Sequence, residues 1–393
     1  LLVHQQYGAV GTGVTTVSVK QIRNQYYDTK YWYNQSSVGL YETKLSYLQQ
    51  IENYFIDDSS SKGFTTILNT MFNSLDTLKN NASDVNTRQQ FIGSAQNLAT
   101  YFNSVSEGLT DIQKGTNDEI KSTVQNINAI AEKIAVLNKQ INVIEIQGGY
   151  ANELRDQRAL LIDELSEIVP TEVSEVPITD TNHPDEPTGA NYYTVKIGGQ
   201  VLVDTYNYET LECKARDYKV NQTDAAGLYD IKWSKTGNTF NAGGSSMSGT
   251  LKALFDIRDG NNGENFSGLA KVLNSTEVQI TNPSITSIVG VSMPEEGILT
   301  INGREYAYEG FTFEQDADGN ITSYTFNMKR ALTAEEQARV DGRTASVGTS
   351  IDAMGIPYYM SQMNQFLRSF ATEFNNILKK GVDLDGNSTS GYA

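Results

Sequence analysis

A run of isoleucines with heptad spacing constrains the fold of this chain more than any other feature. From Ile127 onward the apolar positions alternate in steps of three and four, which is typical of a helix that buries a narrow stripe. Thr116 and Glu119 have the spacing of a capping box at its start, and Gly148 and Gly149 are expected to end it. A helix of this length spans about 40 Å, so the sequence predicts a rod. Its apolar stripe is Ile120, Ile127, Ile130, Ile134, Leu137, Ile141 and Ile144.

Further segments repeat the same spacing and predict more helices. They cover residues ~26–56, 64–78, ~84–112, 152–169 and 360–377. In the first of them the expected buried stripe is Tyr31, Val38, Tyr41, Leu45, Leu48 and Phe55. The last helix lies far along the chain, where its stripe has no partner except the N-terminal helices. We therefore expect both chain ends to form one elongated antiparallel helical bundle.

Between these helices the pattern changes to strands after Pro170. Alternating apolar residues flank Gly198-Gly199 and Asn302-Gly303, which predicts two β-hairpins. The predicted class is multidomain α+β, with β-rich domains inserted into a helical bundle. The expected domains are a discontinuous helical bundle of residues 1–170 plus 351–393, a β-rich domain of 171–260 and an inserted β-rich outer domain of 261–350.

Composition and charge limit the partners and the cellular locations that we expect for this chain. The formal net charge of −17 repels phosphate backbones, so nucleic acid is not an expected partner. No apolar run approaches the ~20 residues of a membrane helix, and no cationic leader precedes an apolar run at Leu1. The chain starts without Met and ends in a loop-like sequence, so we expect it to be an excised fragment. With Cys213 as its one cysteine it forms no intrachain disulfide.

Residues typical of catalysis or metal binding are sparse. His4 and His183 are far apart, and Cys213 has no histidine near it in sequence. Two acidic turns, beginning at Asp316 and Asp383, resemble pieces of calcium loops, but both place Gly too early for an EF-hand. We expect ordinary turns there, and no catalytic, cofactor or metal site.

Arg158 is the one charge inside an expected apolar stripe, between Leu154 and Leu161. Two interpretations stay open. Its stem could cover apolar surface with the charge at the edge, or its guanidinium could pair with a carboxylate across the helix interface.

Four segments together resemble the FlgK family of flagellar hook-associated proteins. They are Gly11-Thr-Gly13-Val followed by Ile22-Arg23 and Asp28; Asn152-Glu-Leu154-Arg-Asp156-Gln-Arg158; the stretch from Gly249 through Arg258-Asp259; and the stretch from Ile356-Pro357 to Gly386. Ala159 departs from the family pattern, which often has Asp there. Residues ~261–350 are extra relative to simpler members, and the family's terminal segments are absent.

This resemblance implies a structural role. Such proteins form a ring of like subunits between the flagellar hook and filament, contacting hook protein on one side and the third hook-associated protein on the other. The resemblance also implies binding to an export chaperone, export by the flagellar type III apparatus, and an extracellular location on the flagellum. It implies structural positions at Gly11, Gly13, Asn152, Leu154, Asp156, Arg158, Arg258 and Asp259, and a monomeric fragment that inserts into no membrane. Another axial protein such as flagellin or the filament cap, a surface adhesin, and an enzyme that cleaves glycans or peptides are the alternatives.

Overall fold

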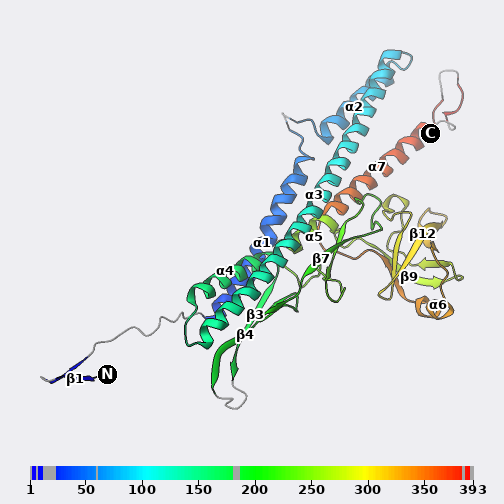
Figure 1. The fold of residues 1–393 in the computed structure, drawn as a ribbon. Helices are drawn as coiled ribbons and strands as arrows, with labels where there is room; N and C mark the ends of the chain where they lie inside the picture. The colour runs from blue at the N-terminus through cyan, green and yellow to red at the C-terminus, as the bar shows by residue number, and fades with distance from the viewer. Residues whose placement is uncertain are drawn as a thin grey trace.

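The molecule combines long helices with antiparallel sheets, so the predicted α+β class is confirmed (Figure 1). This computed structural model describes residues 2–5, 8–11, 24–58, 61–179, 186–382 and 386–389. Within them the helices are α1 (Gln25–Asn53), α2 (Phe64–Asn80), α3 (Val85–Ile146), α4 (Asn152–Ile168), α5 (Gly249–Asp259), α6 (Ala334–Val340) and α7 (Ile356–Leu378), with a short 3-10 turn at Ile288–Gly290.

The central rod is one helix where the sequence predicted two. Helix α3 has 62 residues and spans roughly 90 Å. The capping box predicted at Thr116 is wrong: Thr116 is fully buried in the helix interior, and its hydroxyl donates to the carbonyl of Ile112. The helix begins instead at the N-cap Asp84, whose carboxylate accepts from the amides of Asn86 and Thr87. Burial of its inner face overrides the weak helix propensity around Gly115 and Thr116.

The apolar stripe predicted for the first helix is largely wrong. Trp32, Tyr47 and Ile51 are buried, whereas Tyr31, Val38, Tyr41, Leu45 and Phe55 are exposed, and Leu48 is half-buried. The buried side also contains Ser36 and Gly39, because α1 approaches its neighbours closely there. A Cβ on Gly39 would lie 2.3 Å from the carbonyl oxygen of Glu167 on α4. Small residues mark the contact, and a search for large apolar residues overlooks them.

Two small sheets lie against the rod. The first has the order β3 (Thr171–Thr179), β4 (Pro187–Ile197), β5 (Gln200–Asp204) and β6 (Asn207–Tyr208), all antiparallel. The second pairs β7 (Leu211–Ala215) with β8 (Tyr229–Trp233). The hairpin predicted at Gly198-Gly199 is confirmed as the β4–β5 turn. A separate hairpin near the N-terminus consists of β1 (Leu2–Gln5) and β2 (Gly8–Gly11).

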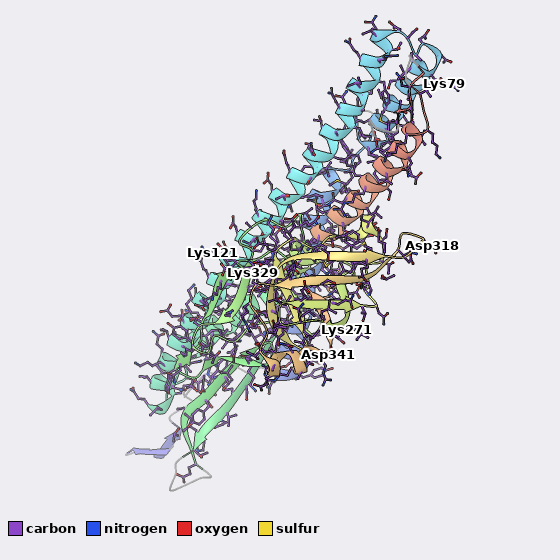
Figure 2. The ribbon with its side chains drawn as sticks, turned by 90° about the vertical axis from the view of Figure 1, so that its right-hand side faces the viewer. Lys79, Lys121, Lys271, Asp318, Lys329 and Asp341 are labelled. Atoms are coloured by element: carbon purple, nitrogen blue, oxygen red, sulfur yellow. The ribbon has the colours of Figure 1, made fainter. Side chains whose placement is uncertain are left out.

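Residues 266–347 form a closed six-stranded barrel with its own hydrophobic core. The hairpin predicted at Asn302-Gly303 joins two neighbouring barrel strands and is confirmed. Figure 1 shows the barrel beside the helices, and in Figure 2, where the barrel faces the viewer, Asp318 lies at the tip of one of its hairpins. The strands follow the order β10 (Glu277–Thr281), β13 (Ile321–Met328), β12 (Arg304–Gln315), β11 (Gly297–Ile301), β14 (Thr344–Val347) and β9 (Phe266–Val272).

Helix α7 returns to the N-terminal helices. Its Phe366 ring lies 5.2 Å from the ring of Phe64 on α2 and 5.9 Å from that of Phe102 on α3. Met360 and Met363 are buried in the same core. The end of the predicted stripe is not covered, since Ile377 is 66% exposed.

Candidate functional site: a polar seam between α3 and the β-strands

The buried face of α3 carries a row of amide side chains that bind the β-strands and the chain around them. We call this row the amide seam; it consists of Gln113, Asn117, Asn128, Asn138 and Asn142. Asn disfavours the interior of a helix because its side chain competes for backbone hydrogen bonds. Here each amide instead satisfies backbone groups of other elements. These contacts attach the strands to the rod along much of its length.

Two members of the seam form paired hydrogen bonds with strand backbone. Asn128 Nδ2 donates to the carbonyl of Leu211 at 2.8 Å, and the Leu211 amide donates to Asn128 Oδ1 at 2.8 Å. Asn142 makes the same exchange with Asn191, at 2.9 Å in each direction. Asn138 donates to the carbonyl of Thr205 at 2.8 Å. In both exchanges the Asn side chain forms the two hydrogen bonds that the backbone of a neighbouring strand would otherwise form.

Arg158 lies next to Asn138 and resolves the two interpretations of its position. Its side chain is buried, donates to Asn138 Oδ1 at 2.9 Å and to Glu175 at 3.2 Å, and its guanidinium carbon lies 3.5 Å from the centre of the Tyr193 ring. The interpretation as a carboxylate pair is confirmed, although the carboxylate comes from strand β3 and not from a helix. Burial lowers the pKa of Arg158. The position therefore ties α4, α3 and β3 together.

A second arginine shares that carboxylate. Arg155 donates through Nε and Nη2 to both oxygens of Glu145, at 2.6 and 2.7 Å, and through Nη1 to Glu175 at 3.0 Å. The fork with Glu145 raises the pKa of Arg155 above its ordinary value. Glu145 is itself buried near the end of α3, so Arg155 neutralises a charge that burial would otherwise penalise.

A second charged cluster surrounds Arg258 and Asp259 at the end of α5. Arg258 is fully buried and donates to Asn117 Oδ1 at 2.9 Å and to the carbonyl of Tyr229 at 2.8 Å. It also forms a fork with the neighbouring Asp259, at 3.0 and 2.6 Å, and Arg216 reaches the same carboxylate at 3.2 Å. Burial by itself would raise the pKa of Asp259, but the two arginines outweigh it and lower that pKa. The cluster joins α5 to α3 and β8.

Helix α1 is fastened to the same body by polar contacts. Trp32 Nε1 donates to Asp163 on α4 at 2.7 Å, and Lys44 pairs with Asp256 on α5 at 2.6 Å. Tyr47 donates to Glu119 on α3, and its burial raises its pKa. These polar pairs, together with apolar packing, therefore fix the position of α1 along α3, α4 and α5.

The predicted structural positions fall in different places. Asn152, Leu154, Asp156 and Arg158 lie on α4, and Arg258 and Asp259 end α5. The partners Asn138 and Asn117 are 21 positions apart on α3, so the two arginine clusters lie roughly 30 Å apart along the rod. Gly11 ends β2, whereas Gly13, Ile22 and Arg23 lie outside the described residues.

The acidic turns, the histidines and Cys213 carry the side chains considered above for metal binding or catalysis. The Asp316 carboxylate accepts from the amides of Asp318 and Asn320, an arrangement that caps the turn and lowers the pKa of Asp316. Residues 383–385 of the second acidic turn, the side chain of His4, and His183 lie outside the described residues. Burial raises the pKa of Cys213, which keeps its thiol protonated. Among the described residues no group of three metal-binding side chains occurs.

The sequence interpretation missed the amide seam. It gave no role to the polar residues along this helix, whereas Asn117, Asn128 and Asn142 bind the backbone of β-strands and Gln113 and Asn138 bind backbone outside the strands. The available signal was the recurrence of Asn at 128, 138 and 142 beside the apolar stripe, in a helix where Asn carries a propensity cost.

Comparison with known proteins identifies the family. Residues 48–276, more than half of the chain, match the model described as the flagellar hook-associated protein FlgK helical domain. The chain is 38% identical over 167 residues to flagellar hook-associated protein 1 of Bacillus subtilis, covering 42% of this chain and 33% of that protein. It is 36% identical over 174 residues to the protein of the same name in Salmonella typhimurium, covering 42% of this chain and 30% of that protein. These matches span about a third of each relative's length.

A solved structure, that of the flagellar hook junction protein FlgK from Burkholderia pseudomallei, aligns with 83% of this chain and 63% of its own. The identity is 16% and the TM-score is 0.47. A helix long and apolar enough to cross a membrane does not occur among the residues described here. From the match over residues 48–276, the chain belongs to the FlgK family of flagellar hook-associated proteins.

Proposed function

We propose that this chain is a structural subunit of the bacterial flagellum that forms part of the junction ring between hook and filament. The observation that carries the proposal is the match of residues 48–276 to the FlgK helical domain. Its function is mechanical and not enzymatic. Its partners are hook protein, the third hook-associated protein on the filament side, and like subunits in the ring.

The rod suits a load-bearing role. A subunit in such a ring must pass torque from a bending hook to a stiff filament without shearing its own domains. Helix α3 spans roughly 90 Å without interruption. The amide seam and the two arginine clusters resist sliding of the strands along α3, because any slip would leave buried polar groups without partners.

We assign three domains to this role. The first is the discontinuous helical bundle, residues 1–170 plus 351–393, which faces the axis of the flagellum. The contacts of Phe366 with α2 and α3 support the inclusion of residues 351–393 in this bundle. The β-rich domain of 171–260 lies against the rod, and the outer domain of 261–350 is displayed outward. The separate hydrophobic core of the barrel supports the last boundary.

The family positions act as structural joints in this scheme. Arg158 and Arg258-Asp259 fasten the strands to α3, and Asn152, Leu154 and Asp156 shape the α4 segment that carries Arg158. Gly11 and Gly13 belong to the N-terminal family segment. The chain binds an export chaperone, leaves the cell through the flagellar type III apparatus, and works extracellularly on the flagellum.

Immunogold electron microscopy of intact flagella tests the proposal, using antibody raised to this chain. Label confined to the boundary between hook and filament is the expected result. Label along the filament or at its tip would assign the chain to another axial position. Absence of flagellar label would overturn the proposal and favour an adhesin or an enzyme.

A further inference from the structure

Helix α1 presents an exposed apolar stripe with heptad spacing. Tyr27, Tyr31, Val38, Tyr41 and Leu45 follow one another in steps of three and four once Asn34 is counted between Tyr31 and Val38. All five apolar side chains are exposed, from 42% for Val38 to 69% for Tyr41. We call these residues the α1 stripe. This period is the one by which helices pack along each other, so the stripe has the pattern of a helix contact, and no described residue of this molecule covers it.

The end of α3 presents a second exposed stripe with the same period. Val136, Lys139, Val143 and Ile146 are separated by three, four and three residues. The three apolar members are 51%, 52% and 57% exposed. We call these residues the α3 stripe. Helix α4 packs against both α1 and α3, and the part of the chain that the structure describes leaves both stripes exposed.

The area of the α1 stripe fits a small, transient contact. Its three tyrosines, Tyr27, Tyr31 and Tyr41, are between 51% and 69% exposed. At roughly 200 Å² for each aromatic side chain, they offer about 380 Å². Val38 and Leu45 add to this area, but the total stays below the ~800 Å² per partner of a standard protein interface. The contact is therefore expected in concentrated solutions of the chain.

Charge favours a second copy of this chain as the occupant. Two molecules of net charge −17 repel each other over most of their surface. The exposed charges on α1 between Tyr26 and Leu45 are Lys30 and Glu42, which cancel. Those on α3 between 131 and 146 are Glu132, Lys133 and Lys139, which leave a net +1. These two faces can therefore meet without the repulsion that opposes other contacts.

We propose that the α1 stripe of one molecule packs on the α3 stripe of a second copy. Pairing the two different stripes buries both, whereas pairing α1 with α1 would leave the α3 stripe uncovered. A contact between unlike surfaces repeats from molecule to molecule and closes into a ring when the rotation allows it. The inference deepens the proposed ring function by naming the surfaces through which like subunits meet.

Photo-crosslinking of the purified, concentrated chain tests this contact. Benzoylphenylalanine in place of Tyr31 is compared with the same analogue in place of Tyr192 on β4; the two tyrosines are 51% and 53% exposed. We expect a homodimer from position 31, crosslinked to a peptide within residues 132–146, and none from position 192. Equal dimer from both positions, no dimer from position 31, or a crosslink from position 31 to α1 would overturn the inference.

A charge exchange provides the second measurement. Tyr31→Lys and Val143→Glu should each weaken self-association in sedimentation equilibrium by roughly tenfold, and the double variant should recover most of the loss. Failure of the double variant to recover would contradict the pairing. Both experiments use the isolated chain, so they are independent of the antibody labelling. Flagellar label without the crosslink would refute only this contact, and the crosslink without flagellar label would refute only the proposed function.

Discussion

Asn128 of α3 and Leu211 of β7 exchange two hydrogen bonds of 2.8 Å, so a helix side chain occupies the place of a neighbouring strand. Leu211 is buried, and its backbone groups are not open to water as they would be on a free sheet edge. The pair shows how the rod and the β-strands are joined, and it can be broken by one substitution.

We expect Asn128→Leu to lower the free energy of unfolding by about 2–4 kcal/mol, because it leaves one amide and one carbonyl of Leu211 buried without partners. Denaturant unfolding followed by circular dichroism measures the change. The matched control is Asn103→Leu, since Asn103 lies on an exposed face of the same helix. A control change as large as that of Asn128→Leu would contradict the role of the pair.

Arg158→Leu should destabilise the protein, by about 1–3 kcal/mol, because the buried Asn138 Oδ1 loses its donor and the partly exposed Glu175 loses one of its two arginine partners. The loss is smaller than for an isolated buried ion pair, since Arg155 continues to hold Glu175. A thermal melt measures it, with Gln157→Leu on the exposed side of α4 as control. A neutral or stabilised Arg158→Leu protein would show that the side chain contributes only its stem.

Two glycines of α3 give a pair of opposite predictions. A Cβ on Gly115 would meet nothing within 4 Å, whereas a Cβ on Gly108 would lie 2.1 Å from the ring of Tyr54. Gly115→Ala should raise the free energy of unfolding by about 0.5–1 kcal/mol through helix propensity. Gly108→Ala gains the same propensity but should be destabilising on balance, because the ring must move. Equal thermal shifts in both variants would show that the contact with Tyr54 is unimportant.

The lowered pKa of Asp259 sets a pH window. A carboxyl whose pKa is lower in the folded state stabilises the fold above its unfolded pKa of about 3.9, and this stabilisation is lost as the pH falls through the folded pKa. We therefore expect Asp259→Asn to be clearly less stable than the parent protein at pH 6. The difference should shrink as the pH falls below about 4. Urea unfolding at several pH values measures it, and a difference independent of pH would contradict the charge pairing.

Much of the fold follows from apolar spacing, and its failures have physical causes. Ile127, Ile130 and Ile134 correctly predict the buried face of α3, because large apolar side chains that recur on one side of a helix usually pack into a core. The same reasoning fails on α1, where Tyr31 and Tyr41 mark an exposed face and the contact side uses Gly39. Spacing records which residues share a face, but not whether that face is covered within one molecule or by another.

The candidate site was less accessible to sequence reasoning. Arg158 could be singled out because a charge interrupted an apolar stripe, and Arg258-Asp259 through the family resemblance. Asn128 gave a weaker signal, the recurrence of Asn at 128, 138 and 142 beside the apolar stripe, and that recurrence does not identify the partners. Its partner Leu211 lies 83 positions away, and closure of the barrel depends on a pairing between β9 and β14 that is similarly distant in sequence.

The barrel should be removable without unfolding the remainder. Its entry and exit chains lie side by side: Asn261 Nδ2 donates to the carbonyl of Thr349 at 2.9 Å, and the amide of Asn262 donates to the carbonyl of Ala353 at 2.8 Å. Replacing residues 263–351 with a short Gly-Ser linker therefore spans a small gap, and the core of the helices and the two small sheets is separate from that of the barrel.

We expect calorimetry of the shortened protein to lose one unfolding transition and to keep the other, with helical circular dichroism retained. The main costs should be at the buried Asn261, which loses its partners Thr349 and Ile351, and at Arg368, which now donates to the carbonyl of Val291 at 2.6 Å. The control deletion removes residues 211–233, whose Leu211, Ile231 and Trp233 belong to the core shared with α3. That deletion should abolish cooperative unfolding of the helices, because it opens the core and also removes Leu211, the hydrogen-bond partner of Asn128. If the barrel deletion were equally disruptive, residues 261–350 would be an integral part of the scaffold and not an appended outer domain.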